Sequence, residues 1–375
     1  NSQMPTDMLG LVHKVFHYFG FFRYTTLPML SSARHILIIQ PLVGIGDMIW
    51  HKPWIDALIA DYQVTLATKP TVQAPTIFHG TPASFQLMMI ERSLRGKRGR
   101  HDGLSGFWRL VRDFRASGAD TAIILHHSTR YAMAAWLAGI KTRLGYGRKG
   151  QQKYLNTGHY LSPLELKQHA VGRIRQFAAR NGFGLDNPAW HITLPKEAHR
   201  QAESYLKSAE LLSEKGRTHP YLCLGIGAMH PERQWGSEKF SQLITGLYRA
   251  RPDMRIALIA GPQDEDIITE IKRHLSALPD MPAPLIIRDR LDVACAVMAR
   301  AEGYVGNDTS LLNLSVCVGR PALGLFSQSE PLDYSPLIHQ LDLFPASAYG
   351  TKGLIHKIST EAVLEAVLRL WPEIK

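Results

Sequence analysis

The chain has 375 residues, of which 45% are hydrophobic, and its 43 basic and 32 acidic residues give a formal net charge of +11. This length exceeds what a single hydrophobic core usually serves, so we expect two domains. The positive charge favours a polyanionic partner and leaves three classes open: nucleic acid, an anionic lipid surface and a phosphorylated substrate.

The cysteine and histidine patterns exclude a disulfide framework and the common zinc motifs. Cys223, Cys295 and Cys317 are far apart in apolar stretches, which is typical of buried thiols in a reducing compartment. There is no CxxC pair and no HExxH, and the 17 histidines show no ligand spacing. On a strand, the adjacent His126 and His127 would point to opposite faces. We therefore expect no metal site.

Residues 1–32 predict a separate amphipathic extension. Apolar side chains recur at helical spacing at Leu11, Val15 and Phe19, with His13 and Lys14 on a polar side. The longest uncharged run there is too short to span a bilayer, and the segment lacks the basic start and cleavage site of a secretory signal. Two alternatives remain: a helix on a membrane surface and a helix packed on the protein's own body.

From Arg34 onwards, apolar runs alternate with amphipathic stretches, which predicts parallel sheets covered by helices on both faces. The elements expected in the first half are strands 36–40, 64–67, 121–125 and 143–146 and helices 131–138 and 167–181. A linker follows at 184–188. The elements expected in the second half are strands 221–224, 256–260, 285–287, 303–305 and 322–326 and helices 237–250, 265–277, 291–300, 309–318 and 361–370.

This pattern predicts two Rossmann-like domains, at 33–185 and 186–355, with a ligand cleft beyond the carboxyl ends of their strands. Residues 356–375 form a terminal helix that could pack back on the first domain.

One segment, 92–100, is strongly basic and is expected as a loop between a strand and a helix. Its cations are Arg92, Arg95, Lys97, Arg98 and Arg100. Such a run is either a solvated loop or a mobile clamp for an anionic substrate.

Two further patterns carry little weight. The hexapeptide at 145–150 matches the dinucleotide-binding fingerprint, but no apolar helix follows it, so it predicts a loop. Asp264, Glu265 and Asp266 form an acidic triplet of the kind that holds a metal-bound diphosphate. They fall in the first turn of an expected helix, where the helix dipole favours carboxylates in any case.

The strand at 303–305 runs into a helix start suited to an anion. Asn307, Asp308, Thr309 and Ser310 are all of types that cap helices. Free backbone N–H groups there, together with the two hydroxyl groups, would suit a diphosphate. The alternative is an ordinary capped helix.

Two other strand ends carry candidate residues. After the strand at 221–224, glycines permit close backbone approach to a ligand, and Arg233 beside Trp235 offers a cation for a leaving group. After the first strand, Asp47 closes a glycine-rich turn. Its carboxylate either acts on a substrate in the cleft or caps the helix that follows.

Taken together, these segments resemble glycosyltransferase family nine, the heptosyltransferases of lipopolysaccharide inner-core synthesis. The resemblance extends over roughly residues 33–372. Three motifs carry it in the family's order: Gly46-Asp47-Met48-Ile49; Gly227-Ala228 with Arg233-Gln234-Trp235 and Glu238-Lys239-Phe240; and Gly306-Asn307-Asp308-Thr309 with Gly319-Arg320-Pro321. Ser310 stands where the family has glycine and Asn313 where it has histidine, so the sugar and base of the donor stay open.

The resemblance implies an α/β fold in the GT-B arrangement, with two Rossmann-like domains facing a central cleft. It also implies an inverting transfer that needs neither metal nor cofactor, with Asp47 as the catalytic base. The residues implied at the nucleotide-sugar donor are Gly227, Ala228, Arg233, Gly261, Gln263, Asn307, Asp308, Thr309, Ser310, Leu311 and Asn313. Those implied at the acceptor are Gly44, Gly46, Arg95, Lys97, Arg98 and Arg143.

The implied donor is ADP-heptose, and the implied acceptor is an anionic glycolipid of the lipopolysaccharide inner core. The protein would then be cytoplasmic and peripheral to the inner membrane of a Gram-negative bacterium, with a membrane surface and no nucleic acid as partner. One alternative is a GT-B transferase that uses a UDP-hexose or UDP-hexosamine on a lipid or protein acceptor. Two others are a nucleic-acid-binding protein and a noncatalytic protein that binds a nucleotide sugar.

Overall fold

The first strand, β1 (His35–Gln40), is buried at every position, as expected of a strand covered on both faces. In this computed structural model, which describes residues 30, 32–92, 97–213, 216, 218–278 and 280–372, β1 lies in the middle of a five-stranded parallel sheet of order β3-β2-β1-β4-β5. The other strands are β2 (Gln63–Thr68), β3 (Phe85–Met89), β4 (Thr121–Ile124) and β5 (Thr142–Gly145).

Alternate side chains of β1 face two helical layers. Ile36 and Ile38 belong to the core that includes residues of α2 and α6, whereas Leu37 and Ile39 belong to the core under α4 and α5. The helices of this half are α2 (Ile45–Asp61), α3 (Ala74–Ile77), α4 (Gly103–Ala116), α5 (Thr129–Leu137) and α6 (Ala170–Arg180).

The second half contains a six-stranded parallel sheet of order β11-β10-β9-β6-β7-β8. Its strands are β6 (Tyr221–Gly225), β7 (Arg255–Ile259), β8 (Leu285–Ile287), β9 (Gly303–Asn307), β10 (Ala322–Leu325) and β11 (Ile338–His339). Its helices are α7 (Lys196–Ser208), α8 (Ser237–Ala250), α9 (Glu265–Leu275), α10 (Leu291–Met298), α11 (Ser310–Cys317) and α12 (Thr360–Leu370).

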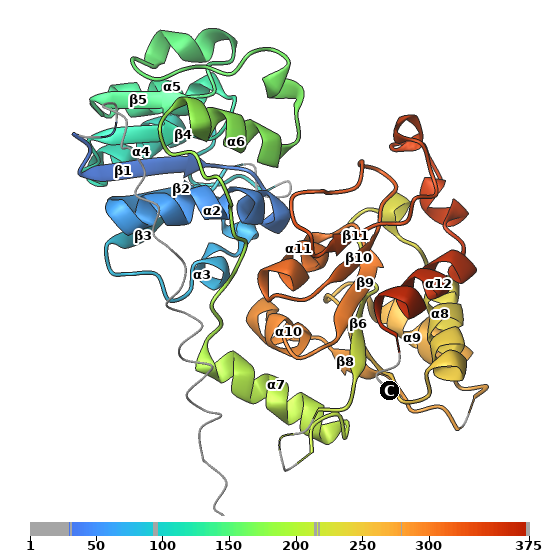
Figure 1. The fold of residues 1–375 in the computed structure, drawn as a ribbon. Helices are drawn as coiled ribbons and strands as arrows, with labels where there is room; N and C mark the ends of the chain where they lie inside the picture. Colours follow the sequence, from blue (N-terminus) through green and yellow to red (C-terminus); the bar gives the residue numbers. More distant parts are fainter. Residues whose placement is uncertain are drawn as a thin grey trace, which may run out of the picture.

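The two halves meet through the helices that follow β1 and β9. Figure 1 shows α2 of the first half beside α11 of the second, and the two helices are in contact. The chain crosses between the halves at 181–195, and α7 then packs on α10. The segments that leave the central strands of both sheets are thus brought together.

The predicted strands are confirmed, and the errors have local causes. The sequence did not predict β3, whose residues are half-buried or exposed at the sheet edge and so form no buried apolar run. It also did not predict α4, α7 and β11. The helix expected from residue 167 begins instead at Ala170, because the side chain of His169 accepts a hydrogen bond from the N–H of Val171 and caps it there.

The terminal helix α12 packs on α8 of the second half. Trp371, directly after it, donates from Nε1 to the carbonyl oxygen of Glu302 at 3.0 Å, and its own carbonyl accepts from Arg251 at 2.7 Å. The expectation that this segment packs back on the first domain is therefore wrong. The extension expected at 1–32 lies outside the described residues, apart from residues 30 and 32. Over the ranges that are described, no helix is long and apolar enough to cross a membrane.

Candidate active site

Asp47 lies in the first turn of α2, directly after β1. Its Oδ2 atom accepts a hydrogen bond of 3.0 Å from the backbone N–H of Gly44, so the carboxylate closes a capping box around the helix start. Burial raises the pKa of Asp47, while the Gly44 hydrogen bond and the charge of Arg173 oppose that shift. The side chain is thus the helix cap that the sequence allowed for, and its raised pKa also suits a proton acceptor.

A buried histidine supports this turn. Nδ1 of His51 donates to the carbonyl oxygen of Asp47 at 2.6 Å. Since a carbonyl only accepts, Nε2 is left to accept from the hydroxyl of Tyr146 at 3.3 Å. Burial lowers the pKa of His51 to about 4, so the ring is neutral near pH 7.

Arg173 of α6 is a site residue that the sequence analysis missed. Its positive charge acts on Asp47, His51 and Tyr146, and its side chain interacts directly with the hydroxyl of Tyr146. Nothing in the local sequence separates Arg173 from the other cations of α6. Only the packing of α6 against α2 brings it to this position.

Asn313 of α11 joins the two halves. Its Oδ1 atom accepts one hydrogen bond from Nε1 of Trp50 in α2 at 2.8 Å and a second from the hydroxyl of Tyr334 at 2.6 Å. The side chain is only 2% exposed. Because hydrogen bonds strengthen where water is excluded, this pair of bonds fixes α2 against α11.

The amide nitrogen of Asn313 extends the same connection to the helix start. Nδ2 donates to the carbonyl oxygen of Thr309 at 3.2 Å, and a Cβ atom placed on Gly46 would come within 3.5 Å of it. The turn that carries Asp47 is therefore held one helical turn away from the beginning of α11.

Asn307, at the end of β9, shapes the loop that follows β6. Its Nδ2 atom donates to two backbone carbonyl groups of that loop at 3.1 and 3.2 Å and to the side chain of Gln234 at 2.8 Å. Its Oδ1 atom accepts from the N–H of Trp235 at 3.1 Å. With its amide hydrogens engaged inside the protein, Asn307 positions the loop that carries Ala228 and Arg233.

The start of α11 has polar groups with spare bonding capacity. The side chain of Thr309 does not cap the helix, and neither its buried hydroxyl nor that of Tyr304 beside it bonds any further group among the described residues. Gly225 and Gly306 make room for the tyrosine, since Cβ atoms there would come within 1.7 and 2.6 Å of its oxygen. Buried hydroxyls with spare bonding capacity beside free helical N–H groups, which begin at Ser310, suit an anionic ligand.

Arg233 reaches the same helix start from the loop after β6. Its Nη1 atom lies 3.3 Å from the carbonyl oxygen and 3.5 Å from Oδ2 of Asp308. Burial raises the pKa of Asp308, against the effects of Arg233 and of a 2.6 Å hydrogen bond from Ser329. The Arg233 side chain is still 38% exposed, so a cation remains available next to Ser310 and the half-buried Leu311.

Asp264 connects the loops after β6 and β7. Its Oδ2 atom accepts from the N–H of Gly261 at 2.6 Å and packs against Gly227, where a Cβ atom would come within 2.2 Å. Gln263 is exposed between these loops, and Glu265 pairs with an arginine. Of the acidic triplet, Asp264 therefore organises two turns. In the part of the chain that the structure describes, no three acidic, histidine or cysteine side chains are grouped as metal ligands.

The residues expected at the acceptor are brought together only in part. Gly44 and Gly46 flank the beginning of α2 beside Asp47, and Lys97 and Arg98 are exposed in the basic loop. Arg95 lies outside the described residues.

Arg143 does not reach this site. Its guanidinium donates to the carbonyl oxygens of Tyr154 and Lys141 at 2.6 and 3.1 Å. It is the second residue of β5 and pairs with Ala122, the second residue of β4. Arg143 thus lies toward the amino ends of these parallel strands, whereas Asp47 follows the carboxyl end of β1.

Two cations and two histidines follow the carboxyl ends of the first sheet, a grouping that the sequence analysis did not predict. Lys69 follows β2, Arg92 follows β3, and His126 and His127 follow β4. The two imidazole rings stack at 4.4 Å, so the expectation that they point apart is wrong, because β4 ends before them. Burial and the charges of His127, Lys69, Arg92 and Arg173 lower the pKa of His126 to about 3. His126 is therefore neutral near pH 7, and the positive charge of this grouping belongs to Lys69 and Arg92.

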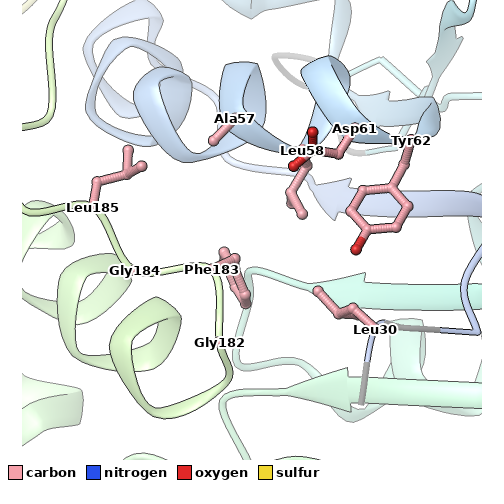
Figure 2. A pocket seen from close by; sticks show the side chains of 9 residues that line it. All are labelled: Leu30, Ala57, Leu58, Asp61, Tyr62, Gly182, Phe183, Gly184 and Leu185. Atoms are coloured by element: carbon pink, nitrogen blue, oxygen red, sulfur yellow. The ribbon is translucent and has the colours of Figure 1, made fainter. Parts of the chain in front are cut away.

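A small apolar pocket lies at the other end of α2 (Figure 2). The residues that line it are Leu30, Ala57, Leu58, Asp61, Tyr62, Gly182, Phe183, Gly184 and Leu185. Among the described residues that line it, Asp61 is the only charged one, and none is a cation of the kind that binds a diphosphate. At 1.5 Å per residue, Asp61 lies about 20 Å along the helix from Asp47. The pocket is separate from the candidate active site.

The sequence matches the model of glycosyltransferase family 9 (heptosyltransferase) over residues 107–358. The chain belongs to glycosyltransferase family 9. It is therefore a glycosyltransferase of the heptosyltransferase family, and the resemblance drawn from its motifs is confirmed. No curated protein matches it by sequence.

Solved structures show the same fold. A family 9 glycosyltransferase from Veillonella parvula has a TM-score of 0.71 at 22% identity, over 92% of this chain and 98% of its own. E. coli ADP-heptose lps heptosyltransferase II has a TM-score of 0.66 at 18% identity, over 90% of this chain and 98% of its own. E. coli heptosyltransferase WaaC with ADP-2-deoxy-2-fluoro heptose has a TM-score of 0.63 at 18% identity, over 89% of this chain and 99% of its own. The predicted α/β fold in the GT-B arrangement is confirmed.

We expect Asn313→Leu to weaken the contact between the halves, because it leaves the buried donors of Trp50 and Tyr334 without an acceptor. An unpaired buried polar group costs about 1–3 kcal/mol, and the free energy of unfolding in urea should fall by at least that amount. Asn187→Leu makes the same change at an exposed linker position. Its free energy of unfolding should stay within about 0.5 kcal/mol of that of the native protein. Equal stability of the two variants would contradict this role for Asn313.

Proposed function

We propose that this glycosyltransferase transfers heptose from ADP-heptose to an anionic glycolipid of the lipopolysaccharide inner core, with inversion and without a metal. Family membership supplies the reaction class. One observation supports the finer proposal more than any other: Asn313 holds the turn of Asp47 against the helix that begins at Ser310. A proton acceptor and an anion site are then held near each other.

Asp47 is the proposed general base. Its carboxylate takes the proton of an acceptor hydroxyl while the hydroxyl oxygen forms a bond to the anomeric carbon of the donor. The bond from that carbon to the diphosphate oxygen breaks, and the electron pair leaves with ADP. Burial makes Asp47 a stronger base than an exposed aspartate, and the nearby Arg173 helps to keep it ionised near pH 7.

The departing diphosphate gains negative charge that the protein has to stabilise. The N–H groups at Ser310 and Leu311, the hydroxyl of Thr309 and the exposed guanidinium of Arg233 are the proposed partners. Gln263 lies at the loop where the base or ribose of the nucleotide would bind. Such fixed donors supply the stabilisation that a metal ion provides in other transferases.

The acceptor is proposed to bind on the first half. Lys69 after β2 and Arg92 after β3 act electrostatically on His126, as does Arg173, whose charge also acts on Asp47. These cations suit the phosphate or carboxylate groups of a glycolipid. Lys97 and Arg98 of the basic loop extend the same charge. We infer that the protein acts in the cytoplasm, peripheral to the inner membrane of a Gram-negative bacterium.

Asp47→Asn tests the base directly, because the amide oxygen can still accept the capping bond from Gly44. We expect turnover with ADP-heptose to fall by about 10²–10⁴-fold, the usual contribution of general base catalysis. The increase in melting temperature on adding ADP should be unchanged. In the native enzyme, turnover should decline on acidification through a pKa above the ordinary aspartate value of about 3.9, since the ionised form is the base. Turnover of Asp47→Asn near the native rate would remove Asp47 from this role.

A second donor class, UDP-hexose or UDP-hexosamine, is favoured by one observation. Ser310 and Asn313, both at the start of α11, are the two departures from the family's motif. Melting temperatures measured with equal concentrations of ADP, UDP and GDP separate the donors, since a ligand at 100 times its Kd stabilises by about 2.7 kcal/mol. We expect the largest shift with ADP and a smaller ADP shift in Arg233→Ala. A larger shift with UDP would favour the second class.

A further inference from the structure

We propose that the outer face of α4 is a membrane-contact surface, which inserts Leu104 and Trp108 among anionic lipid headgroups. This inference deepens the proposed function, because it rests on a lipid-borne acceptor.

The apolar part of this surface is unusually exposed. Leu104 is 85% exposed and Trp108 is 60% exposed. The two lie four residues apart on α4, so they are neighbours on one face of the helix. The opposite face of α4 buries Phe107 and Leu110 in the core of the first half. The exposed pair therefore belongs to a helix whose other face is firmly packed. No described residue buries the apolar surface of the pair.

Basic side chains surround this apolar pair. Arg109 and Arg112 are exposed on α4, and Lys97 and Arg98 are exposed in the loop that precedes it. The acidic residue of this stretch of α4, Asp113, is 16% exposed and is engaged by its basic neighbours. Arg112 follows Trp108 by four residues, so this face of α4 continues from the apolar pair to a positive side chain.

This combination fits an anionic lipid surface better than a protein partner. Tryptophan prefers the boundary between headgroups and acyl chains, where its ring is buried and its N–H stays hydrated. Long arginine side chains can extend from the same depth toward phosphate groups. The net charge of +11 acts in the same direction.

The position of the surface connects it to the proposed acceptor site. The amino end of α4 follows the basic loop that leaves the carboxyl end of β3. Arg130, in the first turn of α5, ties that end in place by donating to the carbonyl oxygens of His101 and Gly103 at 2.9 and 3.1 Å. The helix α5 begins just after His126 and His127. A glycolipid in a membrane at α4 would therefore present its headgroup toward the strand ends that Lys69 and Arg92 follow.

A polarity-sensitive dye tests the surface in the full-length protein. The three native cysteines are buried, so a nitrobenzoxadiazole dye would label an introduced Leu104→Cys selectively. The matched control is Leu164→Cys, which is 77% exposed and precedes α6 on the other face of the sheet. Both labelled proteins are mixed with phosphatidylcholine vesicles that contain or lack phosphatidylglycerol.

We expect the emission at position 104 to rise several-fold and shift to the blue only with phosphatidylglycerol, while the emission at 164 stays constant. Arg109→Glu combined with Arg112→Glu should lower vesicle binding about tenfold. Sedimentation with vesicles without a response at 104 would assign the contact to another segment and overturn the proposal, and so would equal responses at both positions or no sedimentation. The vesicles carry no sugar donor or acceptor. A positive dye response with no transfer from ADP-heptose would therefore contradict only the proposed function.

Discussion

The buried amide of Asn313 is the interaction on which the geometry of the candidate active site depends. Its oxygen accepts from Trp50 of the first half and Tyr334 of the second, and its nitrogen donates to Thr309 at the start of α11. A side chain with two donors facing one acceptor has little freedom to move, because each bond lost in a buried site exposes an unpaired polar group. This residue thus bonds both Rossmann-like halves, within the contact that α2 makes with α11.

Around this connection, the polar residues divide into scaffold and ligand-facing groups. Asn307 and Asp264 form hydrogen bonds to the loops after β6 and β7 and hold the conformation of those loops. Thr309 and Arg233 retain polar groups with spare bonding capacity at the helix start. Burial of the first set gives the second a fixed position, which is what electrostatic catalysis requires. Asp47 combines both properties, since one oxygen caps α2 while its environment raises the pKa.

The sequence predicted the features that depend on local pattern. Buried parallel strands such as β1 are continuous apolar runs, and Asp47 and the start of α11 were found because each follows such a run. β3 was missed because a half-buried edge strand has no comparable pattern. Arg173 and the stacked His126 could not be found, since only tertiary packing gives them their neighbours. Arg143 was chosen for its charge, but its guanidinium is already bonded to the carbonyl oxygens of Tyr154 and Lys141.

The most direct test of the central claim is a crystal structure with ADP-2-deoxy-2-fluoro heptose bound. The account predicts diphosphate oxygens within hydrogen-bond distance of the N–H of Ser310 and the guanidinium of Arg233. It also predicts the Asp47 carboxylate on the face of the anomeric carbon opposite the diphosphate. A diphosphate bound away from α11, or a carboxylate on the same face as the leaving group, would contradict it.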